Sequence, residues 1–524
     1  MAQDEEKAVP QAPTSSAQAV VDGRATSTAK DVDVALAMVG ESQQPIDPAV
    51  AARAVRKIDR VLMPAMMLGY GLVYYDKAIL GSAVLFGMTG DLSLSVVTDA
   101  STTPPTADTS RLSWATSLFY FGMLAGLYPM SFLLQTQPLG RALGTIVSLW
   151  ALTCMLTATV TTHQGLYAQR FALGLAESAI PTGFMCLVSG FYTQREQGLR
   201  QGWWFSATGF WTIIGGALNY GFAQVSGGGL RSWQYIYLFA GALTLLFGLA
   251  CFFAPSDPAG AWFLTPEERL AAVERLREGQ TGVRCTRFKG AQVREAVLDV
   301  KVWLVFLMMA SAYAINGAVS GFGPLIVSTF GWSALDAILL QFPLGGICAA
   351  AILGTGYLGS RFRDVRLVML VLCCLPVIAG CAVIWRSDWA YRAAAPVVGY
   401  SITGFFGAVV SLVITVGMSN VAGHTKKSFM AATIFVAYCV GNIVGPQLVR
   451  SQTKARHYPE LWTGMIICYC ITIAASVALY AVLRRENRRK DQLLADTRPD
   501  EAERAKLAFQ DLTDKENPFF RYVL

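Results

Sequence analysis

The sequence predicts an all-α membrane protein with twelve transmembrane helices arranged in two six-helix halves. Of its 524 residues, 54% are hydrophobic and only 15% are charged, whereas a soluble globular protein carries about 25% charged residues. Mostly apolar runs recur along the chain, and each reaches about the 20 residues that a helix needs to cross a bilayer. One long polar stretch, residues 255–300, divides these runs into two groups of six.

The apolar runs follow one another with short polar connections between them. The first group covers residues 61–86, 112–134, 142–161, 165–191, 203–225 and 233–254. The second group covers residues 302–330, 335–358, 366–385, 393–418, 428–449 and 461–483. We therefore expect a first six-helix bundle over residues 58–254 and a second over residues 301–483.

The segments outside the two bundles are polar. Residues 1–57 hold no apolar core, which predicts a disordered cytoplasmic tail and no cleavable signal peptide. The central loop, residues 255–300, contains "LTPEERLAAVERLREG". There, Thr265 is a helix cap and Pro266 occupies the first position of an amphipathic helix. Residues 484–524 form a charged tail, which we also expect in the cytoplasm.

Lysine and arginine predict the orientation of the chain. A basic cluster precedes the first apolar run, and further basic residues lie in the loops that the same orientation places inside the cell. Because basic flanks remain in the cytoplasm, we expect both termini there. The basic turn "GHTKKS" (residues 423–428) is interpreted as one of these anchors. The protein is thus predicted to be a multi-pass membrane protein, and we expect it in the plasma membrane.

Composition argues against several other classes of protein. The net charge of +7 is modest and is explained by these basic loops, so nucleic-acid binding is not expected. The 11 cysteines lie mostly in apolar runs without a C-x-x-C pair, and the three histidines are scattered. This pattern predicts no metal site and no cofactor. Because no nucleophile–base pair or phosphate loop is evident either, we do not expect an enzyme.

Four ionisable residues lie inside the apolar runs: Asp76, Lys77, Arg170 and Glu177. A charge at the centre of a membrane helix costs about 2.5–3.5 kcal/mol on insertion scales. If the first helix enters near residue 61, Asp76 lies about 22 Å along it. The fourth helix runs in the opposite direction, which places Arg170 about 7 Å and Glu177 about 18 Å from its start. The four groups therefore lie at depths that allow mutual compensation.

Two hypotheses explain these charges. They can form a static ion-pair cluster that sets helix packing. Alternatively, a cation faces a central cavity and binds an anionic substrate, while a carboxylate takes up the coupling proton. Further polar residues inside the apolar runs can bind substrate or join helices by hydrogen bonds; they are Asn316, Gln341, Tyr438 and Asn442. The sequence leaves both hypotheses open.

The residues resemble those of a known family, the fungal allantoate permeases of the major facilitator superfamily. "YYDKAILG" (residues 74–81) is similar to the Asp-Lys signature of that family in its first helix. "YAQRFALGLAESAIPTGF" followed by "FYTQREQGLR" resembles its fourth helix and the next loop. "SNVAGHTKKSFMAATIFVAYCVGNIVGPQL" (residues 419–448) and the terminal "DLTDKENPFFRYVL" resemble its eleventh helix and its tail.

The resemblance implies the major facilitator fold and a monomeric secondary transporter in a lipid bilayer. It also implies proton-coupled uptake of a small organic anion, such as a vitamin, ureide or other carboxylate. By position, Asp76, Lys77, Arg170 and Glu177 then belong to the transport path. The alternative is proton-antiport efflux of a secondary metabolite or toxin. The fifth helix, "GFWTIIGGALNYG" (residues 209–221), lacks the proline found in drug antiporters of the superfamily, which favours uptake.

Overall fold

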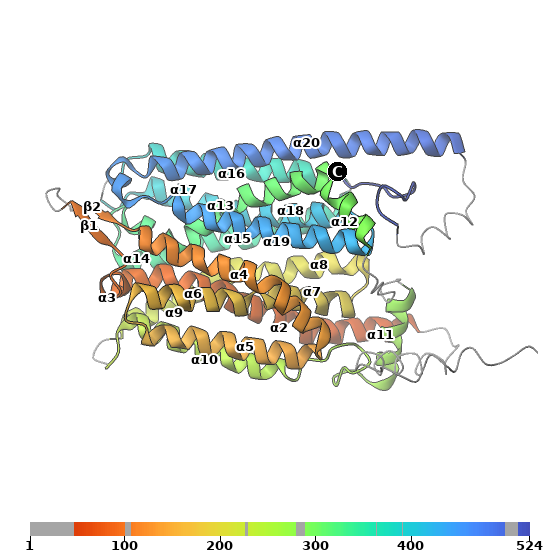
Figure 1. Ribbon diagram of the computed structural model, residues 1–524, viewed down its shortest axis with the longest axis horizontal. Coiled ribbons are helices and arrows are strands. Elements are labelled where there is room, and N and C mark those ends of the chain that lie inside the picture. The colour runs from red at the N-terminus through yellow and green to blue at the C-terminus, as the bar shows by residue number, and fades with distance from the viewer. Residues whose placement is uncertain are drawn as a thin grey trace, which may run out of the picture.

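Long helices lying side by side make up most of the computed structural model (Figure 1), which describes residues 47–99, 106–225, 229–278, 289–362, 364–389, 391–497 and 512–524. The helices of the first half are α2 (Pro48–Ala83), η1 (Val84–Met88), α3 (Thr89–Asp91), α4 (Ser110–Thr136), α5 (Leu139–Leu156), η2 (Thr157–Thr159), α6 (His163–Glu177), α7 (Ala179–Phe191), α8 (Gln194–Phe205), α9 (Ala207–Ala223) and α10 (Ser232–Cys251). Two short strands, β1 (Val96–Asp99) and β2 (Thr106–Asp108), pair antiparallel between α3 and α4.

The second half repeats this plan. Its helices are α11 (Pro266–Glu278), α12 (Gly290–Val297), α13 (Val300–Ser328), α14 (Ala334–Leu339), α15 (Phe342–Arg361), α16 (Arg366–Arg386), α17 (Ala394–Ile402), η3 (Thr403–Phe405), α18 (Phe406–Ser419), α19 (His424–Gln447), η4 (Ser451–Arg456) and α20 (Pro459–Thr497). In Figure 1 the first bundle, red to yellow, lies alongside the second bundle, green to blue. We call the end with β1 and β2 the hairpin face, and the end where α2 begins and α20 ends the terminal face.

The helices agree with the predicted membrane architecture. Within the described residues, nine helical segments are long and apolar enough to cross a membrane. Three further helical segments are formed by α2, by α6 with α7 and by α8 with α9. With these, the arrangement is consistent with the predicted twelve transmembrane helices. The two bundles and the connecting segment with α11 and α12 thus follow the order expected from the sequence.

Several boundaries differ from the expected ones. The helix α2 begins at Pro48, ten residues before the predicted bundle boundary at residue 58. The Asp47 side chain caps this helix by accepting a hydrogen bond from the Ala49 N–H. At the other end, α20 continues to Thr497, well into the predicted tail. The predicted run 165–191 is interrupted at Ser178, and the run 203–225 at Ser206. The rest of the predicted disordered tail, residues 1–46, lies outside the described residues.

The helix expected in the central loop is present as α11. The Thr265 hydroxyl accepts from the Glu268 N–H at 3.4 Å, and the Glu268 carboxylate accepts from the Thr265 N–H at 3.0 Å. This reciprocal pair is a capping box, as the sequence predicts. The same carboxylate lies 2.8 Å from the ammonium of Lys57 on α2. The capping box therefore also fastens α11 to the terminal face of the first bundle.

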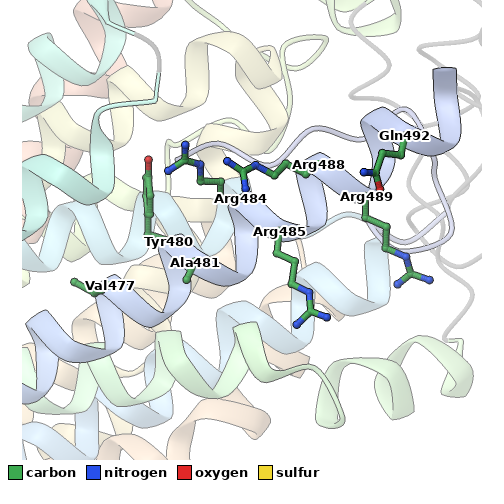
Figure 2. A pocket seen from close by; sticks show the side chains of 8 residues that line it. All are labelled: Val477, Tyr480, Ala481, Arg484, Arg485, Arg488, Arg489 and Gln492. Atoms are coloured by element: carbon green, nitrogen blue, oxygen red, sulfur yellow. The ribbon is translucent and has the colours of Figure 1, made fainter.

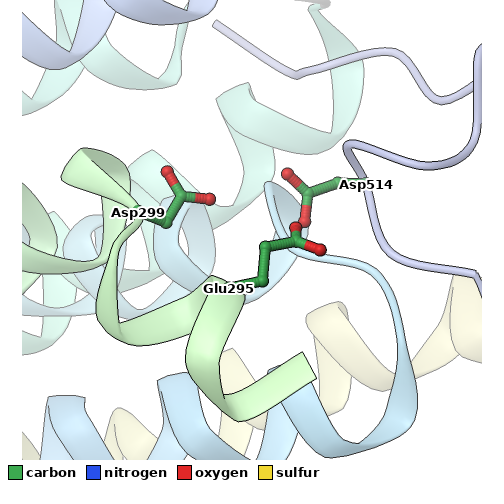
Figure 3. A group of neighbouring side chains, drawn as sticks. All are labelled: Glu295, Asp299 and Asp514. Atoms are coloured by element: carbon green, nitrogen blue, oxygen red, sulfur yellow. The ribbon is translucent and has the colours of Figure 1, made fainter. Parts of the chain in front are cut away.

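Lys426, which the sequence analysis interprets as a basic anchor, is instead fully buried at the terminal face. Its ammonium lies 2.7 Å from Glu295, 2.8 Å from Asp299 and 2.7 Å from Asp514. These carboxylates converge from α12, from the turn before α13 and from the C-terminal segment (Figure 3). Three carboxylates of this kind can hold a metal ion, but here the Lys426 ammonium lies among them and, together with Lys301 and Lys515, compensates their charge.

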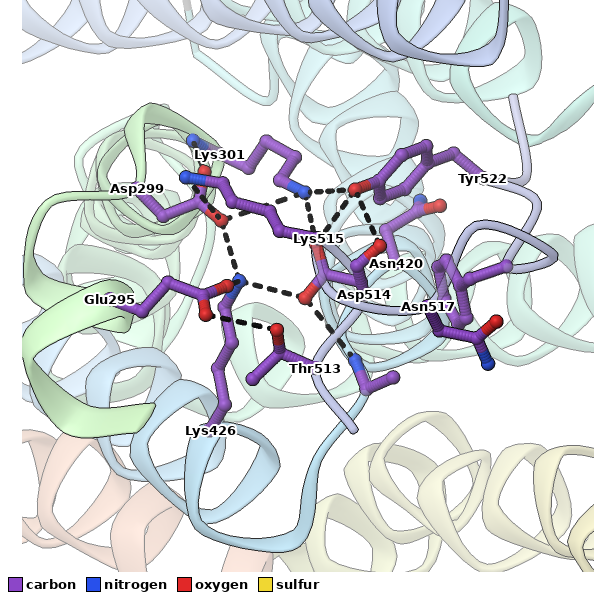
Figure 4. A network of polar contacts seen from close by, with 12 residues as sticks. Glu295, Asp299, Lys301, Asn420, Lys426, Thr513, Asp514, Lys515, Asn517 and Tyr522 are labelled. Atoms are coloured by element: carbon purple, nitrogen blue, oxygen red, sulfur yellow. Dashed lines mark hydrogen bonds and ion pairs between the residues drawn. The ribbon is translucent and has the colours of Figure 1, made fainter. Parts of the chain in front are cut away.

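The C-terminal segment, residues 512–524, is anchored in this polar network (Figure 4). Asp514 also pairs with the Lys301 ammonium, which donates to the Tyr522 hydroxyl at 2.8 Å. Asn420 donates to the Val523 carbonyl and accepts from its N–H. Burial by itself raises the pKa of Asp514, but the two lysines outweigh burial and lower the pKa from 3.8 to about 2. Asp514 therefore remains ionised near neutral pH.

Replacing Lys426 by Met tests this network. The change leaves the carboxylates of Glu295, Asp299 and Asp514 without their shared cation, so we expect unfolding free energy to fall by about 3–5 kcal/mol. Denaturant titration of the purified protein, followed by tryptophan fluorescence, measures the loss. The matched control is Lys515→Met, because the Lys515 side chain is 45% exposed and lies 3.7 Å from Asp299. The control is expected to change stability by less than about 1 kcal/mol. Equal effects of the two substitutions would contradict the structural role of Lys426.

Candidate functional site

A small cavity lies between the two bundles and is lined by residues from both. Its volume is about 20 Å³, enough for about one water molecule. Aromatic rings and one ammonium dominate the lining, which consists of Tyr70, Val73, Tyr74, Lys77, Phe205, Thr208, Tyr313, Asn316, Phe406, Gly407, Val410 and Tyr438. In this conformation the bundles are closed around the site, so binding of an organic molecule requires them to separate.

One face of α2 supplies the cation. Tyr70, Val73, Tyr74 and Lys77 follow the spacing i, i+3, i+4, i+7 and all line the cavity. The Lys77 ammonium lies 3.2 Å from the Tyr438 hydroxyl of the second bundle. It also lies 5.5 Å from the centre of the Phe119 ring and 5.8 Å from that of Tyr438, so both rings help to balance its charge.

Glu177 is the counter-ion of Lys77. Its carboxylate lies 2.7 Å from the ammonium, and its side chain is completely buried, whereas the Lys77 side chain is 10% exposed. Glu177 is the last residue of α6, directly before the break at Ser178. Only Lys77 of this pair lines the cavity. The carboxylate thus lies behind the ammonium, and the cation faces the space where a substrate would bind.

Close packing of α4 against α6 positions Glu177. A Cβ atom on Gly174 would lie 1.9 Å from the Phe119 carbonyl oxygen, and one on Gly122 would lie 2.1 Å from the Phe171 carbonyl oxygen. Neither distance is possible for a side chain, so glycine is required at both positions. Small residues allow such close helix approach in membrane proteins. This contact fixes α6, which ends at Glu177, against α4.

Asp76 points away from the cavity, into the first bundle. Its carboxylate accepts a hydrogen bond from the Trp150 indole at 2.7 Å and from the Cys154 thiol at 3.2 Å. Both donors are neutral and lie on α5. Among the described residues, no ion pair of Asp76 is found. The Asp-Lys signature thus divides its roles: Lys77 faces the second bundle, while Asp76 fastens α2 to α5.

Arg170 is likewise partnered by a neutral group. Its guanidinium donates to the Tyr237 hydroxyl at 2.5 Å, inside the first bundle. The Tyr237 ring lies 5.8 Å from the guanidinium carbon. Of the four charges that the sequence places at similar depth, Lys77 and Glu177 therefore form the direct ion pair. Asp76 and Arg170 meet hydrogen-bonding side chains of α5 and α10 instead.

The remaining predicted residues divide between the cavity and helix packing. Asn316 lines the cavity and donates to the Asn442 amide oxygen at 2.8 Å. Asn442 itself is fully buried and donates to the Tyr438 carbonyl. Gln341 accepts from the Tyr400 hydroxyl at 2.7 Å and lies outside the cavity lining. The structure thus brings Lys77, Asn316 and Tyr438 together, with Glu177 and Asn442 directly behind them.

Apart from Tyr438, the aromatic lining was not among the predicted site residues. Tyr70, Tyr74, Phe205 and Phe406 line the cavity together with Tyr313. The spacing of Tyr70 and Tyr74 relative to Lys77 was available in the sequence, because all three share one helical face. No comparable signal marks Phe205 or Phe406, since they reach the cavity only through the packing of α8 and α18.

Besides the bond from Lys77 to Tyr438, further hydrogen bonds between the bundles lie toward the hairpin face. Ser113 donates to the Pro446 carbonyl at 3.0 Å, and Ser117 donates to the Ile443 carbonyl at 3.2 Å. The Gln447 amide donates to the Ser117 hydroxyl at 3.0 Å. These bonds connect the start of α4 with the end of α19. They close the bundles together between the cavity and the hairpin face.

Comparisons with known proteins agree with this architecture. A family model described as the Major Facilitator Superfamily matches residues 66–446. The uncharacterized transporter C417.10 of Schizosaccharomyces pombe is 33% identical, over 91% of this chain and 91% of that protein. The thiamine pathway transporter THI73 of Saccharomyces cerevisiae is 30% identical, over 90% and 87% of the two chains. The allantoate permease of the same yeast is 29% identical, over 96% and 92%.

A solved structure shows the same fold. The proton:xylose symporter XylE, bound to 6-bromo-6-deoxy-D-glucose, superposes with a TM-score of 0.63 and covers 82% of this chain and 96% of its own. The two sequences are 14% identical, so this similarity concerns the fold alone. The family resemblance and the fold class predicted from the sequence are confirmed by these comparisons.

The contact between α4 and α6 can be tested with Gly174→Ala. The added methyl collides with the Phe119 carbonyl, so we expect a loss of about 1–3 kcal/mol in stability and a displaced Glu177. Gly221→Ala on α9 is the matched control, because a Cβ there meets nothing within 4 Å. Thermal unfolding of both purified variants measures the difference. If Gly174→Ala is as stable as the control, the close approach does not constrain the site.

Proposed function

This chain belongs to the major facilitator superfamily of transporters, and we propose that it takes up a small organic anion together with a proton. The observation that carries the proposal is the position of Lys77. It is the one cationic side chain of the cavity lining in the described part of the chain, and it faces aromatic rings of both bundles. An ammonium in such a site binds a carboxylate, and the rings bind the rest of the substrate.

The pairing of Lys77 with Glu177 supports coupling to a proton. When a substrate carboxylate binds to Lys77, the buried Glu177 loses its counter-ion. An uncompensated buried charge costs several kcal/mol. Protonation of Glu177 removes this cost, so anion and proton bind more favourably together than either does alone. The pair therefore provides a physical reason for symport, in which Lys77 binds substrate and Glu177 binds the proton.

Alternating access supplies the movement. Major facilitator transporters expose a central site alternately to the two sides of the membrane as their halves rock. Separation of α4 from α19 would open this cavity toward the hairpin face, where Ser117 and Gln447 now join the bundles. We place both termini in the cytoplasm and the protein in the plasma membrane, following the distribution of lysine and arginine. Opening at the hairpin face then admits substrate from outside.

The cavity and one relative support a proposal for the substrate class. One similar protein is named for allantoate, whose carboxylate makes it an organic anion. In this chain the cavity offers one ammonium, the Asn316 amide and the Thr208 hydroxyl among its polar groups. We therefore propose a carboxylate such as a vitamin or a ureide as the transported molecule.

A radiolabelled uptake panel in permease-deficient yeast tests the proposal. Vitamins, ureides and other carboxylates are offered to cells that produce the full chain, with and without a protonophore. We expect accumulation of one anionic class, and we expect the protonophore to abolish that accumulation because it removes the proton gradient. Cells carrying the empty vector are the control. If no compound accumulates and a preloaded compound leaves faster, proton-antiport efflux replaces uptake as the function.

Substitution of the ion pair separates binding from coupling. We expect Lys77→Met to abolish uptake, because the carboxylate of the substrate loses its cation. We expect Glu177→Gln to retain exchange of substrate across the membrane but to lose accumulation and its dependence on pH, since the amide takes up no proton. Lys57→Met is the matched control, because Lys57 also lies on α2 but pairs with Glu268 at the terminal face. Normal uptake by Lys77→Met at wild-type protein levels would refute this assignment of the site.

A further inference from the structure

One exposed stripe of α20 is apolar along most of the helix and becomes basic near its end. Exposed residues recur at i, i+3, i+4 and i+7, which is one face of a helix. The stripe is apolar or small through Ala481; its members are Ile467, Cys470, Ile471, Ala474, Val477, Ala478 and Ala481. The next exposed positions on the stripe are all arginine: Arg484, Arg485, Arg488 and Arg489.

The position of this change matches the edge of a bilayer. From Pro459 to Ala481 the helix is about 33 Å long at about 1.5 Å per residue. The hydrocarbon core of a membrane is about 30 Å thick. The first arginine, Arg484, therefore lies just beyond the hydrocarbon, at the depth of the lipid headgroups. The apolar part of the same stripe faces the acyl chains.

The four arginines lack a carboxylate partner among the described residues. In the part of the chain that the structure describes, ion pairs engage Arg200 with Asp59 and Arg275 with Glu196, but none engages these four guanidinium groups. The nearby Asp491 pairs with Arg521 of the C-terminal segment instead. The adjacent Lys490 points inward and donates to the Asn517 carbonyl. Within the described ranges, the arginine face therefore carries positive charge that no ion pair compensates, next to a lipid-facing surface.

The arginine side chains also line a shallow groove on the surface of α20. Figure 2 shows Arg484 and Arg488 on one edge of α20 and Arg485 and Arg489 on the other. Together with Val477, Tyr480, Ala481 and Gln492 they line a groove of about 640 Å³. Guanidinium groups bind phosphate through two parallel hydrogen bonds, so paired arginines suit a phosphorylated headgroup. Basic clusters directly beside a transmembrane helix are typical of sites for anionic lipids.

We propose that this arginine face of α20 binds an anionic phospholipid with a phosphate-rich headgroup. The guanidinium groups contact the phosphates, and the acyl chains lie along the apolar stripe that ends at Ala481. A soluble phosphate would use the arginines but gain nothing from the stripe. This inference requires that α20 spans a membrane and is independent of the substrate and coupling of transport.

Lipid titration of the full-length protein in detergent micelles, followed by native mass spectrometry, tests the proposal. The probes are a phosphoinositide, phosphatidylcholine and the free inositol phosphate headgroup. We expect the phosphoinositide to bind more tightly than either of the others. For the double variant Arg485→Gln/Arg489→Gln we expect about 25-fold weaker binding, at about fivefold for each arginine removed.

The double variant Arg450→Gln/Arg456→Gln is the matched control. It removes the same charge from the hairpin face, where both side chains are exposed, and we expect it to bind the phosphoinositide as the unmodified protein does. Arg484→Gln/Arg488→Gln provides a second, independent variant if the first does not fold. Equal binding of phosphatidylcholine, equal losses in the test and control variants, or equally tight binding of the free headgroup would each overturn the proposal.

Discussion

The ion pair between Lys77 and Glu177 constrains how the helices around the cavity pack. A buried ammonium between two apolar bundles is tolerated only if an opposite charge compensates it. The 2.7 Å contact provides that charge. Glu177 is the last residue of α6, which packs closely against α4 because Gly122 and Gly174 carry no side chain. Because the pair lies where the two bundles meet, any ligand that engages Lys77 also changes the balance of charge at Glu177.

The need to compensate a buried charge also explains how the terminal face is packed. Lys426 is completely buried, and three carboxylates surround its ammonium. One of them, Asp514, is supplied by the C-terminal segment, which thereby becomes part of the folded second bundle. The arginines of α20 lie at the same end of the molecule, but they face outward and form no ion pair with any residue that the structure describes. Buried charges thus hold the protein together internally, whereas the exposed ones are available to the membrane.

The two neighbouring residues Asp76 and Lys77 show how one helix serves two purposes. Successive residues of a helix point about 100° apart. Lys77 therefore faces the cavity, whereas Asp76 faces α5 and accepts hydrogen bonds from Trp150 and Cys154. The static hypothesis suits Asp76 and Arg170, whose partners are neutral and lie within the first bundle. The functional hypothesis suits Lys77 and Glu177, because this pair lies at the junction that alternating access must open.

The fold class, the order of the helices, the cap of α11 and the four charges inside the apolar runs could be predicted from the sequence alone. Apolar run length and capping residues are local properties, so they can be read without a structure. Only the tertiary structure decided that Glu177 partners Lys77, that Lys426 is buried, and that Phe205 and Phe406 line the cavity. These facts depend on how each helix is rotated and how closely it packs against others. Such packing brings together residues that lie far apart in the chain. No local sequence pattern predicts these contacts.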